Sequence, residues 1–432
     1  MNPSEAELLD FVTGRRWFGA KSREATGAAV LDRAAVTETV EVLLTEIRYA
    51  TGTHDVYQLV VNAGGGALED AELLADPGLA RVLVSLMGAG AGLPSEFGEL
   101  SFCSREGLDT PVVRARRIDT EQSNSSIVLD DRLILKLYRR LEAGVSPELE
   151  LLRFLADHEF SNVPQLQGWW SYSGSLMSAT LGIVQQFVPH AVDGWTLALA
   201  ELPDNPDLFL ERVGRLGEVV GALHAVLASD SEEPAFAPED ASPEMLALLR
   251  ATVDDEIEQI FEHLPDDESV APIVGSSGAV RDLLGELANV GSIGKVIRHH
   301  GDLHLGQVLL SDGDWFVVDF EGEPARSLPE RRVKRSPLRD VAGMLRSFAY
   351  VVHVAGCASY AYERARELFL DGYLGIVEGT GILPQPYQVE RLIGIFELEK
   401  AVYELRYELS HRPDWVHIPV AGIESLLTKT TT

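Results

Sequence analysis

The chain has 432 residues, 46% of them hydrophobic, and a formal net charge of −31. This length is sufficient for a large hydrophobic core and predicts two or three globular units. The acidic charge disfavours binding to nucleic acid or to an anionic membrane, and it requires local cations or Mg²⁺ wherever a phosphorylated ligand binds.

Targeting and redox signals are sparse. Cys103 and Cys357 are far apart in the chain, so no disulfide framework is expected. The start, MNPSEAELLDF, lacks the charged and apolar regions of a signal peptide. The apolar stretch 347–362 is interrupted by His353 and is too short to span a bilayer, so it predicts one buried helix. We therefore expect a cytoplasmic protein without a membrane segment.

The first 88 residues are expected to form a domain of their own. A helix is predicted at 4–12, and strands are predicted at 40–50 and 56–66. Within this part, GRRWFGAKSR contains several cations that could bind an anion, but burial of Trp17 and Phe18 in a local core is the better interpretation.

Strand patterns dominate residues 89–189, and helical patterns dominate residues 190–432. One helix interrupts the strands, with Ser146 as its expected N-cap and Pro147 at its first position. A β-rich half followed by a helical half, with a small strand pair inside the latter, is the order of a two-lobed kinase. The predicted fold class is therefore α+β, bilobal and protein-kinase-like, with an additional N-terminal domain.

The most informative stretch is HHGDLHLGQ at 299–307, followed by DFEGEP at 319–324. His300, Asp302 and His304 could bind a metal, and Asp-x-His also opens the two-metal phosphoesterase pattern. The further ligands that such a site requires do not follow downstream. A plain polar turn would leave the second motif unexplained.

Phosphoryl transfer explains both motifs. It uses an Asp that accepts the hydroxyl proton, an amide residue five positions later for Mg²⁺, and a second Asp after a short hairpin. Asp302, Gln307 and Asp319 have this spacing. Gln307 replaces the more usual Asn, which places its amide oxygen one methylene further out. Glu321 is either another metal ligand or a surface acid.

Lys136 lies inside the apolar strand LILKLY. A buried ammonium requires an anionic partner, and the following helix offers Glu148 and Glu150. We expect Glu150 to be the partner, because an acid in the first turn, such as Glu148, is typically a surface residue stabilised by the helix dipole. The alternative is an edge-strand lysine that extends its ammonium into water.

A loop over the phosphates is less clear. No GxGxxG precedes Lys136, and EQSNSSIVL occupies its place. The polar groups of Ser123, Asn124, Ser125 and Ser126 could bind phosphates or could form an ordinary polar hairpin tip. GSIGKV is not a P-loop, because the residue after its Lys is Val.

A sugar pocket is suggested by the helix ELEKAVYELRYEL, where Lys400, Tyr403, Glu404 and Tyr407 have the spacing of one helix face. The alternative is the ordinary core and surface of a C-terminal helix. In a neighbouring segment, Asp340 and Arg346 are candidates for a structural ion pair.

Taken together, HHGDLHLGQVLL…WFVVDFEGEP, EQSNSSIVL…LILKLYRRLEAGVSPELELL, GRRWFGAKSR and LEKAVYELRYELSHRPDWVHIPVAGI resemble the actinobacterial maltokinases. These are aminoglycoside-phosphotransferase-like sugar kinases, and the resemblance covers the whole chain. It implies an N-terminal cap domain at 1–88, a β-rich N-lobe at 89–189 and a helical C-lobe at 190–432.

The resemblance also implies an activity. ATP with Mg²⁺ would phosphorylate the anomeric hydroxyl of maltose, giving maltose 1-phosphate for α-glucan (glycogen) synthesis, and the enzyme would associate with trehalose synthase. By motif position, Asp302 is the catalytic base, Gln307 and Asp319 bind the metal, and Lys136, oriented by Glu150, binds phosphates. The backbone at Gln186 and Val188 would contact the adenine base of ATP.

Three alternatives remain open from the sequence. The acceptor could be another sugar or an amino sugar such as glucosamine, because the lobe motifs do not specify it. The chain could be a catalytically silent scaffold for trehalose synthase. It could also be a metallophosphoesterase that uses the histidines.

Overall fold

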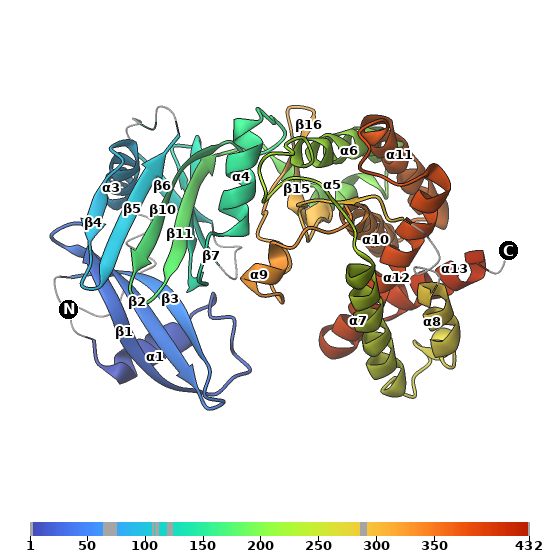
Figure 1. The fold of residues 1–432 in the computed structure, drawn as a ribbon, viewed down its shortest axis with the longest axis horizontal. Coiled ribbons are helices and arrows are strands. Elements are labelled where there is room, and N and C mark those ends of the chain that lie inside the picture. The colour runs from blue at the N-terminus through green and yellow to red at the C-terminus, as the bar shows by residue number, and fades with distance from the viewer. Residues whose placement is uncertain are drawn as a thin grey trace. The chain divides into compact units, whose positions relative to one another are not determined.

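The computed structural model describes residues 3–63, 76–105, 108, 112–118, 124–285 and 292–430. Ser123 of the predicted phosphate loop lies outside these ranges. The chain divides into two compact units, 1–189 and 190–432, and Figure 1 shows that the first is mainly sheet and the second mainly helix.

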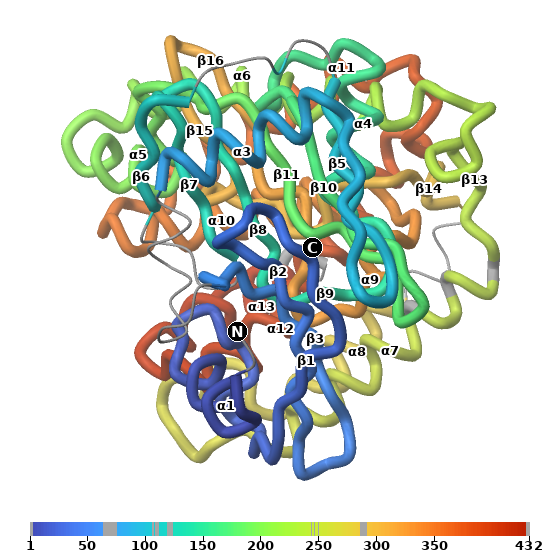
Figure 2. Tube along the Cα trace, turned by 90° about the vertical axis from the view of Figure 1, so that its left-hand side faces the viewer, coloured from blue at the N-terminus to red at the C-terminus, as the bar shows by residue number. Residues whose placement is uncertain are grey.

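The N-terminal part of the first unit is a four-stranded antiparallel sheet in the order β1-β2-β3-β9. Trp17 and Phe18 pack on the ring of Tyr57, each with a centroid separation of 5.7 Å, which confirms their predicted burial. Figure 2 shows α1 beside these strands. The elements are α1 (Glu5–Thr13), β1 (Ala25–Ala35), β2 (Val40–Tyr49), β3 (His54–Asn62) and β9 (Arg140–Leu141).

A second antiparallel sheet of the same unit has the order β4-β5-β10-β11-β8-β7-β6. Its central strands β7, β8 and β11 are buried along almost their whole length. The elements are α3 (Pro77–Gly88), β4 (Gly92–Pro94), β5 (Gly98–Ser104), β6 (Ala115–Ile118), β7 (Asn124–Leu129), β8 (Leu133–Tyr138), α4 (Pro147–Asp157), β10 (Leu166–Gly174) and β11 (Ser178–Gln186).

Two buried polar side chains join these sheets. Gln58 of β3 donates hydrogen bonds to the carbonyls of Tyr138 (3.0 Å) and Leu181 (2.8 Å). Asp32 of β1 accepts hydrogen bonds from the side chains of Ser95 and Tyr172, both at 2.7 Å, and from backbone N–H groups of the β4–β5 turn. Because buried polar groups are costly when unpaired, these bonds fix how the two sheets of residues 1–189 meet.

The second unit contains two pairs of packed helices, α6 with α11 and α10 with α12, and a small hairpin. Gly217 of α6 allows close packing, because a Cβ there would lie 2.1 Å from the carbonyl oxygen of Phe369 on α11. The helices are α5 (Gly194–Glu201), α6 (Pro206–Leu227), α7 (Pro243–Glu262), α8 (Ser277–Gly285), α9 (Leu328–Arg331), α10 (Leu338–Val354), α11 (Ser359–Val377), α12 (Pro386–His411) and α13 (His417–Thr430).

Short strands complete this unit. β15 (Val308–Ser311) and β16 (Asp314–Val317) form the hairpin, and β12 (Val192–Asp193) pairs with β15. One strand of the small pair expected in the helical half, at 294–300, is reduced to β14 (Lys295–Val296), which pairs with β13 (Glu239–Asp240). Single-turn 3₁₀ helices are η1 (Ala271–Ile273), η3 (Leu305–Gln307) and η4 (Pro413–Trp415).

The prediction of one helix over 347–362 is wrong. α10 ends at Val354 and α11 begins at Ser359. Between them, Gly356 has φ of +67°, a left-handed conformation that ends a helix and favours glycine.

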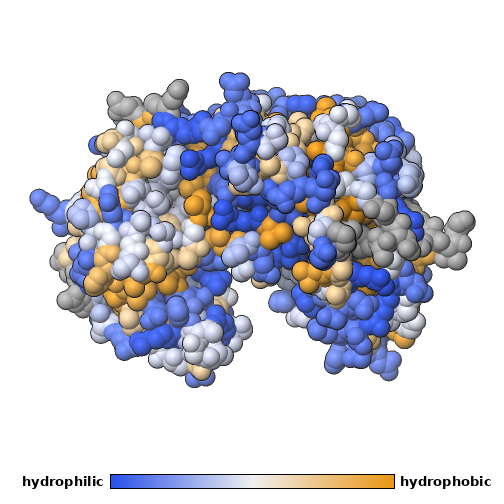
Figure 3. Space-filling model, viewed as in Figure 1, coloured by the Kyte–Doolittle hydropathy of each residue, from blue (hydrophilic) through white to orange (hydrophobic). Residues whose placement is uncertain are grey.

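Within the described ranges, none of the helices combines the length and the apolar character needed to cross a bilayer. Figure 3 shows mainly hydrophilic side chains over α7 and α8.

The hydrogen bonds to Asp32 predict a pH-dependent stability. Burial raises the pKa of this carboxyl, but the bonds from Tyr172, Ser95 and the backbone outweigh burial and leave the pKa below its ordinary value. Its stabilising contribution is therefore present above about pH 4 and is lost as the pH falls through the folded-state pKa. We expect Asp32→Asn to lower the free energy of unfolding by about 2 kcal/mol at pH 7.

Urea unfolding of both proteins between about pH 2 and pH 7 checks this expectation. Asp32→Asn should lose less stability than the wild type below about pH 4. If the free energies of unfolding of the two proteins change in parallel with pH over the whole range, Asp32 is not the source of the pH dependence.

Candidate functional site

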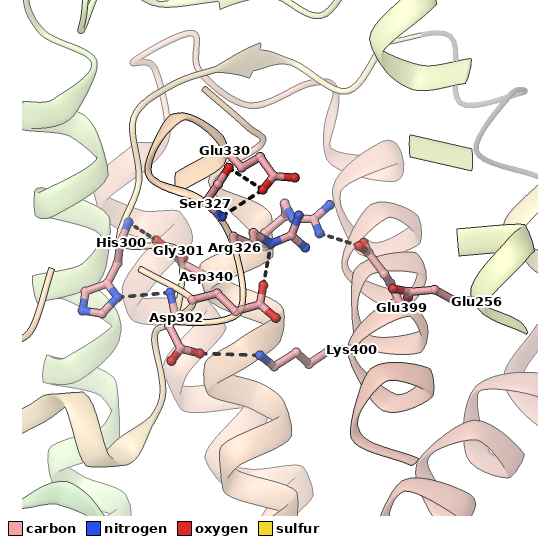
Figure 4. A network of polar contacts seen from close by, with 12 residues as sticks. Glu256, His300, Gly301, Asp302, Arg326, Ser327, Glu330, Asp340, Glu399 and Lys400 are labelled. Carbon is pink, nitrogen blue, oxygen red and sulfur yellow. Dashed lines mark hydrogen bonds and ion pairs between the residues drawn. The ribbon is translucent and has the colours of Figure 1, made fainter. Parts of the chain in front are cut away.

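The loop 299–307 is held by one buried carboxylate. Asp340 of α10 accepts the backbone N–H groups of His300 (2.8 Å) and Gly301 (2.9 Å), and Nε2 of His224 lies 3.1 Å from it (Figure 4). Burial raises the pKa of Asp340, but the neighbouring histidines and the hydrogen bond from His224 outweigh burial and hold the pKa below its usual range. Gly301, with φ of +86°, makes the turn that presents Asp302.

His300 supports the same loop from inside. Its Nδ1 accepts the N–H of Asp302 at 3.3 Å, and its Nε2 donates to the carbonyl of Val318 at 2.9 Å. Both ring nitrogens of His300 are therefore engaged within the protein. His304 similarly accepts the N–H of Gly306 at 3.0 Å. No cluster of three metal-ligating side chains among the described residues contains either histidine, so the interpretation as a histidine metal site is not supported.

Asp302 lines a pocket in the unit 190–432, where Nζ of Lys400 lies 3.6 Å from its carboxylate. Burial lowers the pKa of Lys400, but the carboxylates of Asp302, Glu404 and Glu323 outweigh burial, so the pKa is raised and the ammonium stays charged. Tyr403 lines the same pocket one turn further along α12. The structure thus brings two of the four predicted sugar-binding residues to Asp302.

The other two do not line this pocket, which corrects the prediction that all four residues line one sugar pocket. Glu404 forms a buried ion pair with Arg346 of α10, at 2.8 Å. Arg346 therefore pairs with Glu404 and not with Asp340. Tyr407 is 42% exposed and stacks on His411. The four positions do share one face of α12, but that face meets different neighbours along its length: Arg346 of α10 lies against Glu404, and Tyr407 lies one turn beyond Tyr403.

The predicted metal ligands meet at the β15–β16 hairpin. The strands pair Val308 with Val317, so Gln307 and Asp319 flank the same end, and Nε2 of Gln307 donates to Asp319 at 3.1 Å. Asp319 has φ of +64°. A carboxylate oxygen of Glu321 lies within 4.8 Å of one of Asp319. Two carboxylates and an amide oxygen are a donor set that suits Mg²⁺.

In the unit 1–189, Lys136 forms its ion pair with Glu148, at 3.0 Å, and the hydroxyl of Tyr138 donates to the same carboxylate at 2.7 Å. The prediction of Glu150 is therefore wrong. Glu148 has the spacing of the buried face of α4, which also holds Leu152 and Leu155. That periodicity was the signal that could have identified it.

The predicted phosphate loop is part of a strand. Asn124 and Ser126 pair with Tyr138 and Lys136 in the register of β7 and β8, so their side chains share the face of Lys136. Ser125 points to the opposite face, where its Oγ accepts the Nε–H of Arg139 at 2.8 Å. The alternative of a hairpin tip is thus excluded for residues 124–126, and their binding of phosphates stays a prediction. Ser123 lies outside the described residues.

β11 ends at Gln186, and the backbone at this end of the strand hydrogen-bonds to other segments of the unit 1–189. Gln186 donates its N–H to the carbonyl of Gln165 (2.8 Å), and Phe187 donates to the carbonyl of Arg132 (2.7 Å). Gln186 is exposed and Val188 is buried. The role of Gln186 and Val188 in reading adenine stays a prediction.

Several residues that line the pocket beside Asp302 were not identified from the sequence. His299 lines it, and burial lowers its pKa to about 3, so its imidazole is neutral. The ion pairs Arg326–Glu323 (2.6 Å) and Arg339–Glu399 form part of the wall. The density of arginines in 326–339 was the available signal. The other charged residues that line the pocket include Glu256, Glu330, Arg331 and Arg335.

Comparison with known proteins identifies relatives for both parts of the chain. Residues 114–322 match the family model of the phosphotransferase enzyme family, and residues 11–84 match the maltokinase N-terminal cap domain. The chain is 31% identical over 345 residues to a glucosamine kinase of Mycolicibacterium smegmatis, and the alignment covers 73% of this chain and 80% of the relative. A glucosamine kinase of Streptacidiphilus jiangxiensis is 27% identical over 346 residues, covering 73% and 74%.

A solved glucosamine kinase in complex with glucosamine, ADP and inorganic phosphate has a TM-score of 0.75 at 22% identity, covering 99% of this chain and 100% of that chain. This likeness shows a shared fold. Together with the family matches, it confirms the predicted α+β kinase-like class with an N-terminal cap domain.

The ion pair of Lys136 predicts unequal effects of its two candidate glutamates on stability. Glu148→Gln should lower the free energy of unfolding by about 3 kcal/mol, because it removes the carboxylate that lies 3.0 Å from a buried ammonium. Glu150→Gln should lower it by less, because the 3.0 Å ion pair of Lys136 is with Glu148 and Glu150 is less buried than Glu148. Urea denaturation of the two variants is the measurement. Equal losses would contradict the assignment of Glu148.

Proposed function

Because the chain belongs to the phosphotransferase enzyme family, as a sugar kinase with a maltokinase-type cap domain, we propose that it transfers the γ-phosphoryl group of ATP to a hydroxyl of glucosamine. The family membership confirms the resemblance seen in the motifs. The choice of glucosamine is supported by the two glucosamine kinases that align with most of this chain.

The observation that carries the proposal is the position of Asp302. Its backbone is fixed through Asp340 and His300, and its carboxylate is directed into a pocket next to Lys400. In phosphoryl transfer, such a carboxylate orients the acceptor hydroxyl and takes its proton. The transition state is loose, so positioning and neutralisation of charge provide most of the rate. Lys400 supplies a positive charge where the negative charge of the phosphoryl group develops.

Mg²⁺ fits the residues at the β15–β16 hairpin. Asp319 and Glu321 provide carboxylate oxygens, and rotation of the Gln307 side-chain amide would direct its oxygen to the same point. When bound, the ion would neutralise phosphate oxygens of the nucleotide. Such local neutralisation is required in a chain with a net charge of −31.

For the nucleotide, we propose that Lys136 binds phosphate oxygens and that Glu148 orients it. Asn124 and Ser126 lie on the same face of the sheet as Lys136, which makes them candidates for the same nucleotide. The backbone at Gln186 and Val188 remains the proposed adenine contact.

Maltose is a second candidate acceptor, because the cap domain matches that of maltokinases. In that case the product is maltose 1-phosphate, a donor for α-glucan synthesis. Association with trehalose synthase stays a prediction. A catalytically silent scaffold is less well supported, because the proposed base, metal ligands and phosphate lysine are all present in the chain.

An acceptor panel tests the proposed function. Release of ADP from ATP is measured with glucosamine, N-acetylglucosamine, glucose, maltose and an aminoglycoside, with and without Mg²⁺. We expect glucosamine to give the highest kcat/KM and chelation of the metal to abolish turnover. Preference for maltose would select the second candidate. Hydrolysis of phosphate esters without ATP would instead support a phosphoesterase.

Asp302→Asn tests the catalytic assignment. The amide has nearly the shape of the carboxylate but cannot accept the hydroxyl proton, so kcat should fall by roughly 10³-fold. Affinity for ATP, measured by calorimetry, should change little, because the proposed nucleotide contacts involve other residues. Turnover close to that of the wild type would exclude Asp302 as the base.

A further inference from the structure

A second carboxylate faces the same pocket as Asp302. Glu256 of α7 lines this pocket together with Glu399 and Lys400 of α12. Figure 4 shows Glu256 next to Glu399, whereas Asp302 approaches from the loop on another side of the pocket. An acceptor sugar whose hydroxyl lies at Asp302 can therefore contact Glu256 with a different substituent.

Two further carboxylates that line this pocket, those of Glu323 and Glu399, have close cationic partners. Glu323 is 2.6 Å from Arg326, and Glu399 pairs closely with Arg339. The ion pair of Glu256, with Arg406, is longer at 3.9 Å, and the Arg406 side chain is half exposed. Exposed pairs at such distances contribute little stabilisation. Of the carboxylates of Glu256, Glu323 and Glu399, that of Glu256 is thus the one farthest from its cationic partner.

The electrostatic surroundings agree with this geometry. Burial raises the pKa of Glu256; Arg406 opposes this, Glu399 adds to it, and the net pKa is above the ordinary value. A raised carboxyl pKa means that its charged form lacks stabilisation, and a cation bound beside it would supply that stabilisation.

We propose that Glu256, with Glu399 beside it, binds the protonated amino group of the acceptor sugar and so selects amino sugars over neutral ones. An ammonium has three N–H donors and no acceptor, which suits a pair of carboxylates. Phe396 and Tyr403 line the same pocket and add aromatic side chains to its wall. The inference rests on the proposed function and names the group that makes the site specific.

Calorimetry with the full-length protein tests the proposal without depending on turnover. Glucosamine, N-acetylglucosamine and glucose are titrated into the wild type and into Glu256→Gln. We expect Glu256→Gln to bind glucosamine about 30-fold more weakly, the loss typical of removing one partner of a desolvated charge pair. Binding of the two neutral sugars should change by less than about threefold, because they bring no charge to Glu256.

Glu258→Gln is the matched control. Glu258 lies on the same helix but pairs with Arg281 of α8, at 3.1 Å, so its loss should leave glucosamine binding unchanged. Glu256→Asp keeps the charge and should retain most of the preference for glucosamine. Thermal unfolding of all three variants shows whether a change in binding is caused by misfolding.

The outcomes separate this inference from the proposed function. If the wild-type protein phosphorylates glucosamine but Glu256→Gln lowers the affinity for charged and neutral sugars equally, the inference is wrong and the proposed function stands. If glucosamine binds with the expected dependence on Glu256 but ATP is not consumed, the inference stands and the proposed function is wrong. A wild type that binds glucose as tightly as glucosamine overturns the inference.

Discussion

The site depends on the hydrogen bonds between one buried carboxylate and the backbone of the catalytic loop. Asp340 is 2% exposed and receives the N–H groups of His300 and Gly301 while it contacts His224. Charge-assisted bonds in a low-dielectric interior are strong, and breaking one of them leaves a buried charge. α10 and the loop therefore form one rigid element. Gly343 permits this contact, because a Cβ there would lie 2.6 Å from the carbonyl oxygen of Leu303.

The second constraint is charge. An acidic chain that handles phosphate needs local positive charge, and the structure concentrates it at a few places. Lys400 is held at Asp302, and burial, Arg339 and Arg326 lower the pKa of Arg335 to about 10 at the same pocket. A guanidinium with that pKa is still charged at neutral pH. The pocket thus contains both signs of charge in separate positions, and such an arrangement can distinguish acceptors by where they carry a charge.

The sequence alone determined the parts of the site that lie close together along the chain. The five-residue step from Asp302 to Gln307, the hairpin and Asp319 were predictable, because a tight hairpin returns the chain to the same end of two strands whatever surrounds it. The α+β order and the burial of Trp17 and Phe18 followed from local patterns of apolar residues. The break between α10 and α11 was missed, because a single glycine within an apolar run does not by itself show where a helix ends.

Only the tertiary structure decided which side chains meet across elements. The partner of Lys136 is Glu148 because the packed face of α4 carries that residue to the sheet. Likewise, Glu404 of α12 forms its ion pair with the buried Arg346 of α10, whereas Lys400 and Tyr403 line the pocket. Glu256, about 46 positions before Asp302, had no local motif at all. The physical reason is that spacing fixes direction within one element, whereas a contact between elements depends on how their buried faces pack.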